Sequence, residues 1–183
     1  RRCAQQHQRD DDSGGMVGWG IAVGDMNGDQ VPDLVLVNET SATVGVLLGS
    51  GDGTFQPAAA FSSAGYSPRQ AVVADLNGDG KQDVVVVNLC AGSSSDCIGS
   101  ITVLLGNGDG TLQAAVSYGT GGYNSAYLST ADVNSDGRPD LLVGNLCGNT
   151  SCSPGTLGVL LGNGDGTFQP AVTYDAGGAH PNS

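Results

Sequence analysis

The sequence predicts an all-β protein made of a repeated four-stranded unit, and three observations lead to this prediction. Short runs of Val, Leu and Ala alternate with glycine-rich segments along most of the chain. Thirty-one glycines stand against three Phe and one Trp, and no segment keeps a helical period, which favours short strands joined by tight turns. A pattern rich in aspartate occurs three times at similar spacing, which is typical of a repeat protein.

Each unit is expected to contain four strands in a fixed order. An aspartate-rich loop follows the first strand, and the second strand is apolar without alternation, which predicts burial on both faces. The third strand leads into a Gly-Asp-Gly turn with positive φ angles, and the fourth strand follows that turn. The predicted strands are residues 20–24, 34–37, 44–48 and 57–61; then 70–74, 84–87, 101–105 and 114–118; then 128–131, 141–143, 157–161 and 170–174.

These strands define three units at residues 14–65, 66–122 and 123–178. Residues 1–13 are polar and match nothing in the units, so they are interpreted as a tail. Residues 179–183 are interpreted as a tail or as the start of a further repeat.

The aspartate-rich loops carry oxygen ligands at positions 1, 3, 5 and 9. Ca²⁺ takes about six to eight oxygens, and alternate residues of a tight loop can direct such groups to one centre, so we expect calcium, about one ion per repeat. An EF-hand is excluded, because its closing glutamate is replaced by Leu36, Val86 and Val143. The candidate ligands are Asp25, Asn27, Asp29 and Asp33; Asp75, Asn77, Asp79 and Asp83; and Asp132, Asn134, Asp136 and Asp140.

The net charge of −12 is concentrated in these repeats. Each repeat has three loop aspartates and one in the Gly-Asp-Gly turn, and the remaining six acids equal the six Lys and Arg in number. With no basic patch, nucleic acid is not an expected partner. No apolar stretch approaches the roughly 18 residues that a membrane helix needs, so no membrane span is expected.

Four of the five cysteines form two local pairs at matching places, Cys90 with Cys97 and Cys147 with Cys152. A short Cys-bounded loop that recurs in two repeats predicts two disulfides and an oxidising, extracellular compartment. A two-Cys metal site fits less well, because no histidine lies near either pair. Cys3 is left over, as a free thiol or a link to another segment or chain.

The complete pattern resembles a known family. Asp-x-Asn-x-Asp-Gly-x-x-Asp before an apolar run, followed by Leu-Leu-Gly-Asn-Gly-Asp-Gly-Thr-Phe, resembles the FG-GAP/VCBS repeat of integrin-α-like β-propellers over residues 14–178. The resemblance implies propeller blades whose loop between the first two strands binds Ca²⁺. It adds the backbone carbonyls of Val31, Lys81 and Arg138 as ligands at position 7.

The first loop departs from the other two at position 6. Gln30 stands where the others have Gly80 and Gly137, which predicts strain or a lower affinity in this loop.

Three blades are too few for a closed propeller, which usually has about four to eight. Two explanations remain open: the sequence belongs to a longer chain, or three-blade chains associate into a ring or a fibre through open strand edges. The expected partners are further blades or other copies of the chain, with a cell-surface protein or a glycan as further candidates.

Two asparagines, Asn38 and Asn149, begin glycosylation sequons in the loops between second and third strands, and both are candidate modification sites.

The leading function is an extracellular or cell-surface structural or adhesive module stabilised by calcium. The chain is not expected to be an enzyme, because its only histidines are His7 and His180 and it has no Gly-x-Ser-x-Gly elbow. The alternatives are a non-catalytic domain of a larger secreted enzyme, or a lectin. For a lectin, the candidate residues at the rim of a sugar-binding site are Trp19, Tyr66, Tyr123 and Tyr127. Packing between blades explains these aromatic residues better.

Overall fold

The computed structural model describes residues 18–92, 97–149 and 154–177. All the regular secondary structure in these ranges is β-strand, as predicted. These ranges contain no helix that could span a membrane. The predicted tails at residues 1–13 and 179–183, with Cys3, lie outside the described residues. The strands are β1 (Gly18–Gly24), β2 (Asp33–Asn38), β3 (Thr43–Leu47), β4 (Ala59–Ser62), β5 (Tyr66–Ala74), β6 (Asp83–Cys90), β7 (Ile98–Leu104), β8 (Val116–Ala131), β9 (Asp140–Cys147), β10 (Thr156–Leu160) and β11 (Val172–Asp175).

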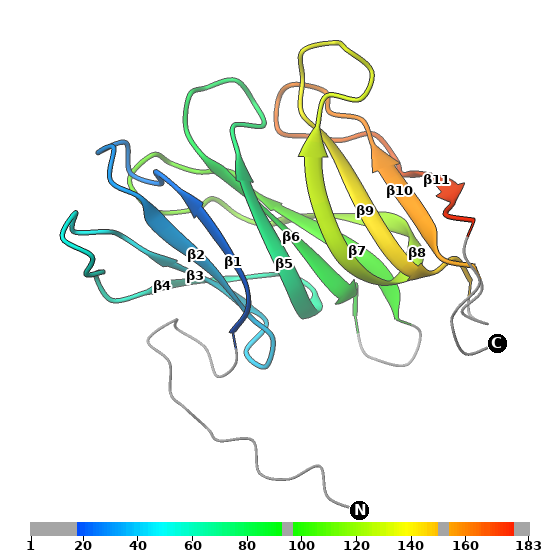
Figure 1. The fold of residues 1–183 in the computed structure, drawn as a ribbon, viewed down its shortest axis with the longest axis horizontal. Helices are drawn as coiled ribbons and strands as arrows, with labels where there is room; N and C mark the ends of the chain where they lie inside the picture. The colour runs from blue at the N-terminus through cyan, green and yellow to red at the C-terminus, as the bar shows by residue number, and fades with distance from the viewer. Residues whose placement is uncertain (1–17, 93–96, 150–153, 178–183) are drawn as a thin grey trace, which may run out of the picture.

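The strands form two antiparallel sheets (Figure 1). One has the order β1-β2-β3-β4, and the other has the order β11-β10-β9-β8-β7-β6-β5. We call residues 18–62 the first unit, residues 66–119 the middle unit and residues 123–175 the third unit. The structure confirms an all-β fold but not three separate four-stranded blades, because β8 serves both the middle and the third unit.

Strand β8 joins these two units without a break. Its first part pairs with β7, with Tyr118 opposite Ile101, and its last part pairs with β9, with Leu128 opposite Val143. Tyr123 lies between the two parts and is opposite residues of both neighbouring strands. The Gly-Thr-Gly-Gly segment at residues 119–122 therefore continues the strand that the sequence predicts to end there.

Two apolar cores lie between the units. Strand β6 contributes to both, because Val84 and Val86 pack against the first unit while Val85 and Val87 pack against the third. Alternate residues of a strand point to opposite faces, so a strand covered on both sides has to be apolar throughout. The predicted burial of this strand on both faces is confirmed, since all four valines are 0% exposed.

Candidate metal loops

Each aspartate-rich loop connects two paired antiparallel strands. The loops begin and end at residue pairs that face each other across the sheet: Gly24 and Asp33, Ala74 and Asp83, Ala131 and Asp140. This is the strand-loop-strand arrangement that the sequence predicts. The nine positions therefore lie in equivalent places in all three units.

The position-1 carboxylates organise the loop backbone. Asp25 accepts hydrogen bonds from the N–H groups of Gly28 at 2.7 Å, Asp29 at 3.1 Å and Gln30 at 2.8 Å. Desolvation raises the pKa of Asp25, but the N–H donors outweigh it and hold this pKa below its ordinary value. In the third loop the Gly137 N–H likewise lowers the pKa of Asp132.

Positions 3 and 5 continue this pattern with short local hydrogen bonds. The Asn27 side-chain oxygen accepts from the Asp29 N–H at 3.1 Å, and Asp29 accepts from the Val31 N–H at 2.8 Å. The other loops repeat both bonds, through Asn77 and Asp79 and through Asn134 and Asp136. Such Asx-type bonds hold a tight turn with its oxygen atoms in fixed places.

Position 6 has a left-handed backbone in every loop. Gln30 has φ of 65°, beside 79° for Gly80 and 81° for Gly137. Gln30 therefore adopts the same left-handed conformation as the two glycines. Because Gln30 has a Cβ atom, this conformation is strained, as the sequence predicts.

The position-9 carboxylates are buried, and both oxygens of each accept backbone hydrogen bonds. Asp33 accepts from Met26 N–H at 2.8 Å and from Gly49 N–H at 2.7 Å. Asp83 and Asp140 make the same pair of bonds in their units. These aspartates thus tie the loop to the end of the third strand, a structural role that the sequence interpretation missed.

A sequence signal for this role exists in the Leu-Leu-Gly motif that ends each third strand. A Cβ at Gly49, Gly106 or Gly162 would collide with the backbone carbonyl oxygen of the residue before the aspartate. Glycine is needed there because the two segments approach so closely.

In donor chemistry the loops fit a hard cation. Apart from Asp25 Oδ1, which accepts two N–H groups, each carboxylate oxygen of the loops accepts at most one hydrogen bond and keeps a lone pair, and the predicted ligands are all oxygens. Burial raises the pKa of Asp83, the Gly106 and Leu76 N–H groups oppose this, and the negative charges of Asp79 and Asp75 raise it further. These three carboxylates therefore repel one another.

Carboxylates alone do not complete the site. No three His, Cys, Asp or Glu side chains come together as a metal cluster within residues 18–92, 97–149 and 154–177. The amide oxygens at position 3 and the carbonyls of Val31, Lys81 and Arg138 would have to complete the coordination. In the second loop the Lys81 ammonium group already offsets part of the negative charge, since its Nζ lies 3.9 Å from Asp79 Oδ2.

The Gly-Asp-Gly aspartates stabilise their own turns. Asp109 accepts from the N–H of Thr111 at 2.9 Å and from its hydroxyl at 2.5 Å, which together lower the pKa of this aspartate. Asp52 and Asp165 make the same bonds. The glycines on either side of each aspartate have positive φ in all three turns, which confirms the predicted turn conformation.

One predicted disulfide is confirmed directly, between Cys90 and Cys97. It closes the segment that joins β6 to β7. Cys147 is also disulfide-bonded, and its predicted partner, Cys152, lies outside the described residues.

The two sequon asparagines differ in exposure. Asn38 is 0% exposed and its side-chain nitrogen donates to Thr43, so this fold leaves no room for a glycan on that atom. Asn88 and Asn145 occupy the same repeat position and are buried and hydrogen-bonded as well, which identifies a recurring structural asparagine. Asn149 is exposed, and glycosylation there stays a prediction.

The candidate sugar-binding aromatics do not line the three hollows that the described part of the chain shows on the first and third units. Tyr66 and Tyr127 are exposed and Tyr123 is half-buried, while the side chain of Trp19 lies outside the described part.

The fold and the loops define a class of β-repeat protein in which each unit pairs an aspartate-rich hairpin loop with a Gly-Asp-Gly turn. A family model described as FG-GAP-like repeat matches residues 25–86 and 88–143, which is more than half of the chain. The chain therefore belongs to the FG-GAP-like repeat family. A comparison with curated proteins gave no match.

Proposed function

We propose that this chain is an extracellular structural or adhesive repeat module whose aspartate-rich loops bind calcium, about one ion per loop. The observation that carries the proposal is the threefold recurrence of one loop with carboxylate or amide oxygens at positions 1, 3, 5 and 9, in which the position-6 N–H donates to the position-1 carboxylate each time. Membership of the FG-GAP-like family, whose repeats are generally non-catalytic, supports a binding or structural role.

Calcium would offset the charge of the loops. Each nine-residue loop contains three carboxylates. The second loop contains one basic residue, Lys81, the third contains one, Arg138, and the first contains none. A bound divalent ion would remove the repulsion among these carboxylates and hold the strand connections rigid.

The disulfides support an extracellular location. The Cys90–Cys97 bond persists only where thiols are not kept reduced, and extracellular calcium levels suit modules that bind at about 10⁻⁴ to 10⁻³ M. Partners would be further units of the same kind or a molecule at a cell surface.

The first test is thermal unfolding in calcium and in a chelator. With calcium at about 100 times the dissociation constant, one occupied site adds about 2.7 kcal/mol. For a protein of this size we expect chelation to lower the melting temperature by roughly 5–10 °C per site lost. An unchanged melting temperature would overturn the calcium role.

A matched pair of variants locates the ions. Asp79→Ala removes a predicted ligand, whereas Asp109→Ala removes an exposed, hydrogen-bonded aspartate outside the predicted set. Equilibrium dialysis should show that the first variant binds one calcium fewer than the parent chain and that the second binds the same number. Equal loss in both variants would mean that the loops are not the binding sites.

A further inference from the structure

The first unit has an apolar face that points away from the rest of the molecule. Ile21 lies opposite Leu36 and Val23 lies opposite Leu34, so these four side chains share one face of the sheet. Ile21 is 66% exposed and Val23 is 60% exposed. Phe55 is 41% exposed and lines one hollow with Leu47, which lies opposite Leu34 in the sheet. We call Ile21, Val23, Leu34, Leu36 and Phe55 the entry face.

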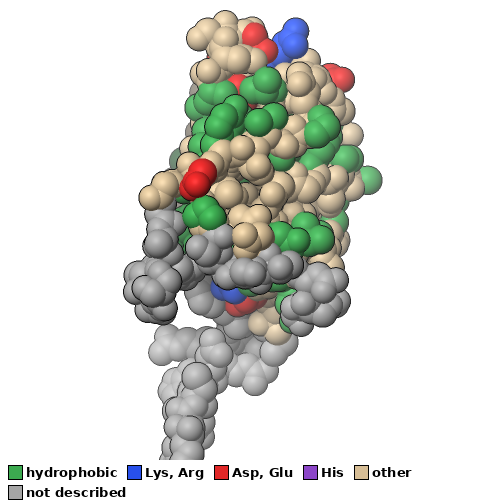
Figure 2. All heavy atoms as spheres, turned by 90° about the vertical axis from the view of Figure 1, so that its right-hand side faces the viewer, with side chains coloured by type: hydrophobic (Ala, Val, Ile, Leu, Met, Phe, Trp, Pro, Cys, Tyr) green, Lys and Arg blue, Asp and Glu red, His purple; other side chains and the backbone are tan. Residues whose placement is uncertain are grey.

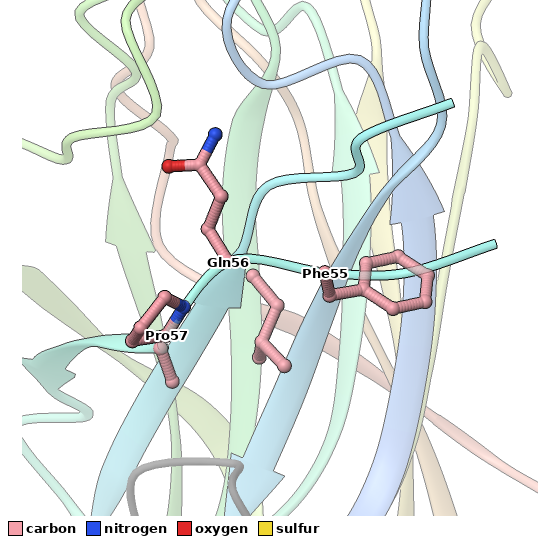
Figure 3. Close-up of a pocket in the computed structure, with 5 residues that line it drawn as sticks. Phe55, Gln56 and Pro57 are labelled. Carbon is pink, nitrogen blue, oxygen red and sulfur yellow. The ribbon is translucent and has the colours of Figure 1, made fainter. Parts of the chain in front are cut away.

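A shallow hollow of about 470 Å³ lies at the edge of the entry face (Figure 3). Leu47, Phe55 and Ala58 are among its lining residues, with Gln56 and Pro57 on the same segment. Such a hollow beside exposed apolar side chains offers room for a side chain of a partner.

The third unit has a second apolar face at the opposite end of the molecule (Figure 2). Leu142 lies opposite Val159, which lies opposite Val172, and Leu157 lies opposite Tyr174. Val133 is 48% exposed, and Val172 and Tyr174 are each 55% exposed. The residues of this exit face are Val133, Leu142, Leu157, Val159, Val172 and Tyr174.

Both faces occur again inside the molecule, where a neighbouring unit covers them. Phe55, Leu112 and Phe168 follow the Gly-Asp-Gly-Thr turn of their respective units, but Leu112 is only 8% exposed and Phe168 only 6%. The exit face shows the same difference in exposure. Met26 and Leu76 hold the repeat position of Val133, and they are 1% and 2% exposed. The positions of Phe55 and Val133 are therefore buried wherever a neighbouring unit is present, whereas Val116, at the repeat position of Val172, stays 52% exposed in the middle unit.

The internal contacts show what fits these faces. Phe168 packs edge to face on Tyr118, with ring centroids 5.8 Å apart, and Tyr118 holds the repeat position of Tyr174. Gly110 and Gly166 lie against the side chains of Leu48 and Leu105 of the preceding unit. At the first unit, a Cβ on Gly53 would meet nothing within 4 Å.

We propose that the exit face of one copy of this chain binds the entry face of a second copy, head to tail, with Phe55 of one copy against Tyr174 of the other. The contact continues the interface that the chain already makes twice between its own units. Because the two faces differ, each copy keeps one free face, and the association extends into a ring or a fibre. This inference names a partner for the module proposed above and rests on its repeat role, but not on calcium.

The test measures mass by light scattering over a wide concentration range, with calcium present throughout. The parent chain should rise above its single-chain mass of 18.2 kDa as concentration increases. Phe55→Asp and Tyr174→Asp should each remain single, because a buried carboxylate opposes the contact. Ile98→Asp alters a side chain that is 50% exposed on the middle unit and should associate like the parent chain.

Mixing the two blocked variants distinguishes head-to-tail contact from other arrangements. Phe55→Asp keeps a working exit face and Tyr174→Asp keeps a working entry face, so an equal mixture should form a dimer and stop there. Unchanged thermal unfolding of each variant at low concentration shows that the fold is intact.

Three results would overturn the proposal: a parent chain that stays single at every concentration, blocked variants that associate as the parent does, or a mixture that forms no dimer. None of these results affects the calcium proposal, which the chelator experiment decides separately.

Discussion

Strands β6 and β2 occupy the same place in their units, yet their burial differs. In β6 the valines at residues 84–87 are all 0% exposed, whereas in β2 only Val35 and Val37 are, and Leu34 and Leu36 are half-buried. Both strands are equally apolar in sequence. The comparison shows that the repeated sequence supplies two apolar faces to every unit, and that the number of neighbouring units decides how many of them are covered.

The largest expected effect is on the free energy of unfolding. It is a difference between two residues at the same repeat position, one covered by a neighbouring unit and one not. Leu76→Ala should lower the free energy of unfolding by about 3 kcal/mol, because it leaves a cavity in the core between the middle and third units. Val133→Ala should cost less than about 1 kcal/mol, because this side chain is 48% exposed. Urea denaturation of the two variants at low protein concentration measures both values, and similar losses would contradict the comparison.

A smaller effect is expected at the Gly-Asp-Gly turns. Gly110→Ala and Gly53→Ala both place a side chain at positive φ, at a cost of about 1–2 kcal/mol. Only at Gly110 would the new Cβ also press on the Leu48 side chain, 2.8 Å away, so we expect an additional loss of about 1 kcal/mol. Thermal unfolding of the two variants measures this difference, and its absence would mean that Leu48 moves aside freely.

The smallest effect concerns the first aspartate-rich loop and its equivalents. Gln30→Gly should stabilise the chain by about 0.5–1 kcal/mol, because glycine adopts the observed φ of 65° without steric strain. Gly80→Gln introduces the reverse change in the second loop and should destabilise it by a similar amount. Denaturation in chelator isolates the backbone effect from metal binding, and a loss of stability in Gln30→Gly would contradict the argument.

The sequence predicts those features that local patterns determine. Apolar runs locate the strands, glycine pairs around Asp52, Asp109 and Asp165 give the turns with positive φ, and the spacing of Cys90 and Cys97 gives the disulfide. The three loops fall where the aspartates predict them, between paired strands. Calcium in those loops stays a prediction that only binding measurements can decide.

Features that depend on distant neighbours are not visible in the sequence. Residues 119–122 have the composition of a turn, but pairing with both β7 and β9 keeps the backbone in one strand. Asn38 fits a sequon, yet packing places it in the interior with its equivalents Asn88 and Asn145. Asp33 has the spacing of a ligand, and only the fold shows that the N–H groups of Met26 and Gly49 bind both its oxygens.

The continuous strand β8 also bears on how the molecule would respond to mechanical force. The middle and third units share one hydrogen-bonded strand, whereas between β4 and β5 residues 63–65 leave the sheet. A pull along the chain would reach this interruption without having to shear a strand that two units share. The first unit would then yield separately, while the other two would resist as a single body.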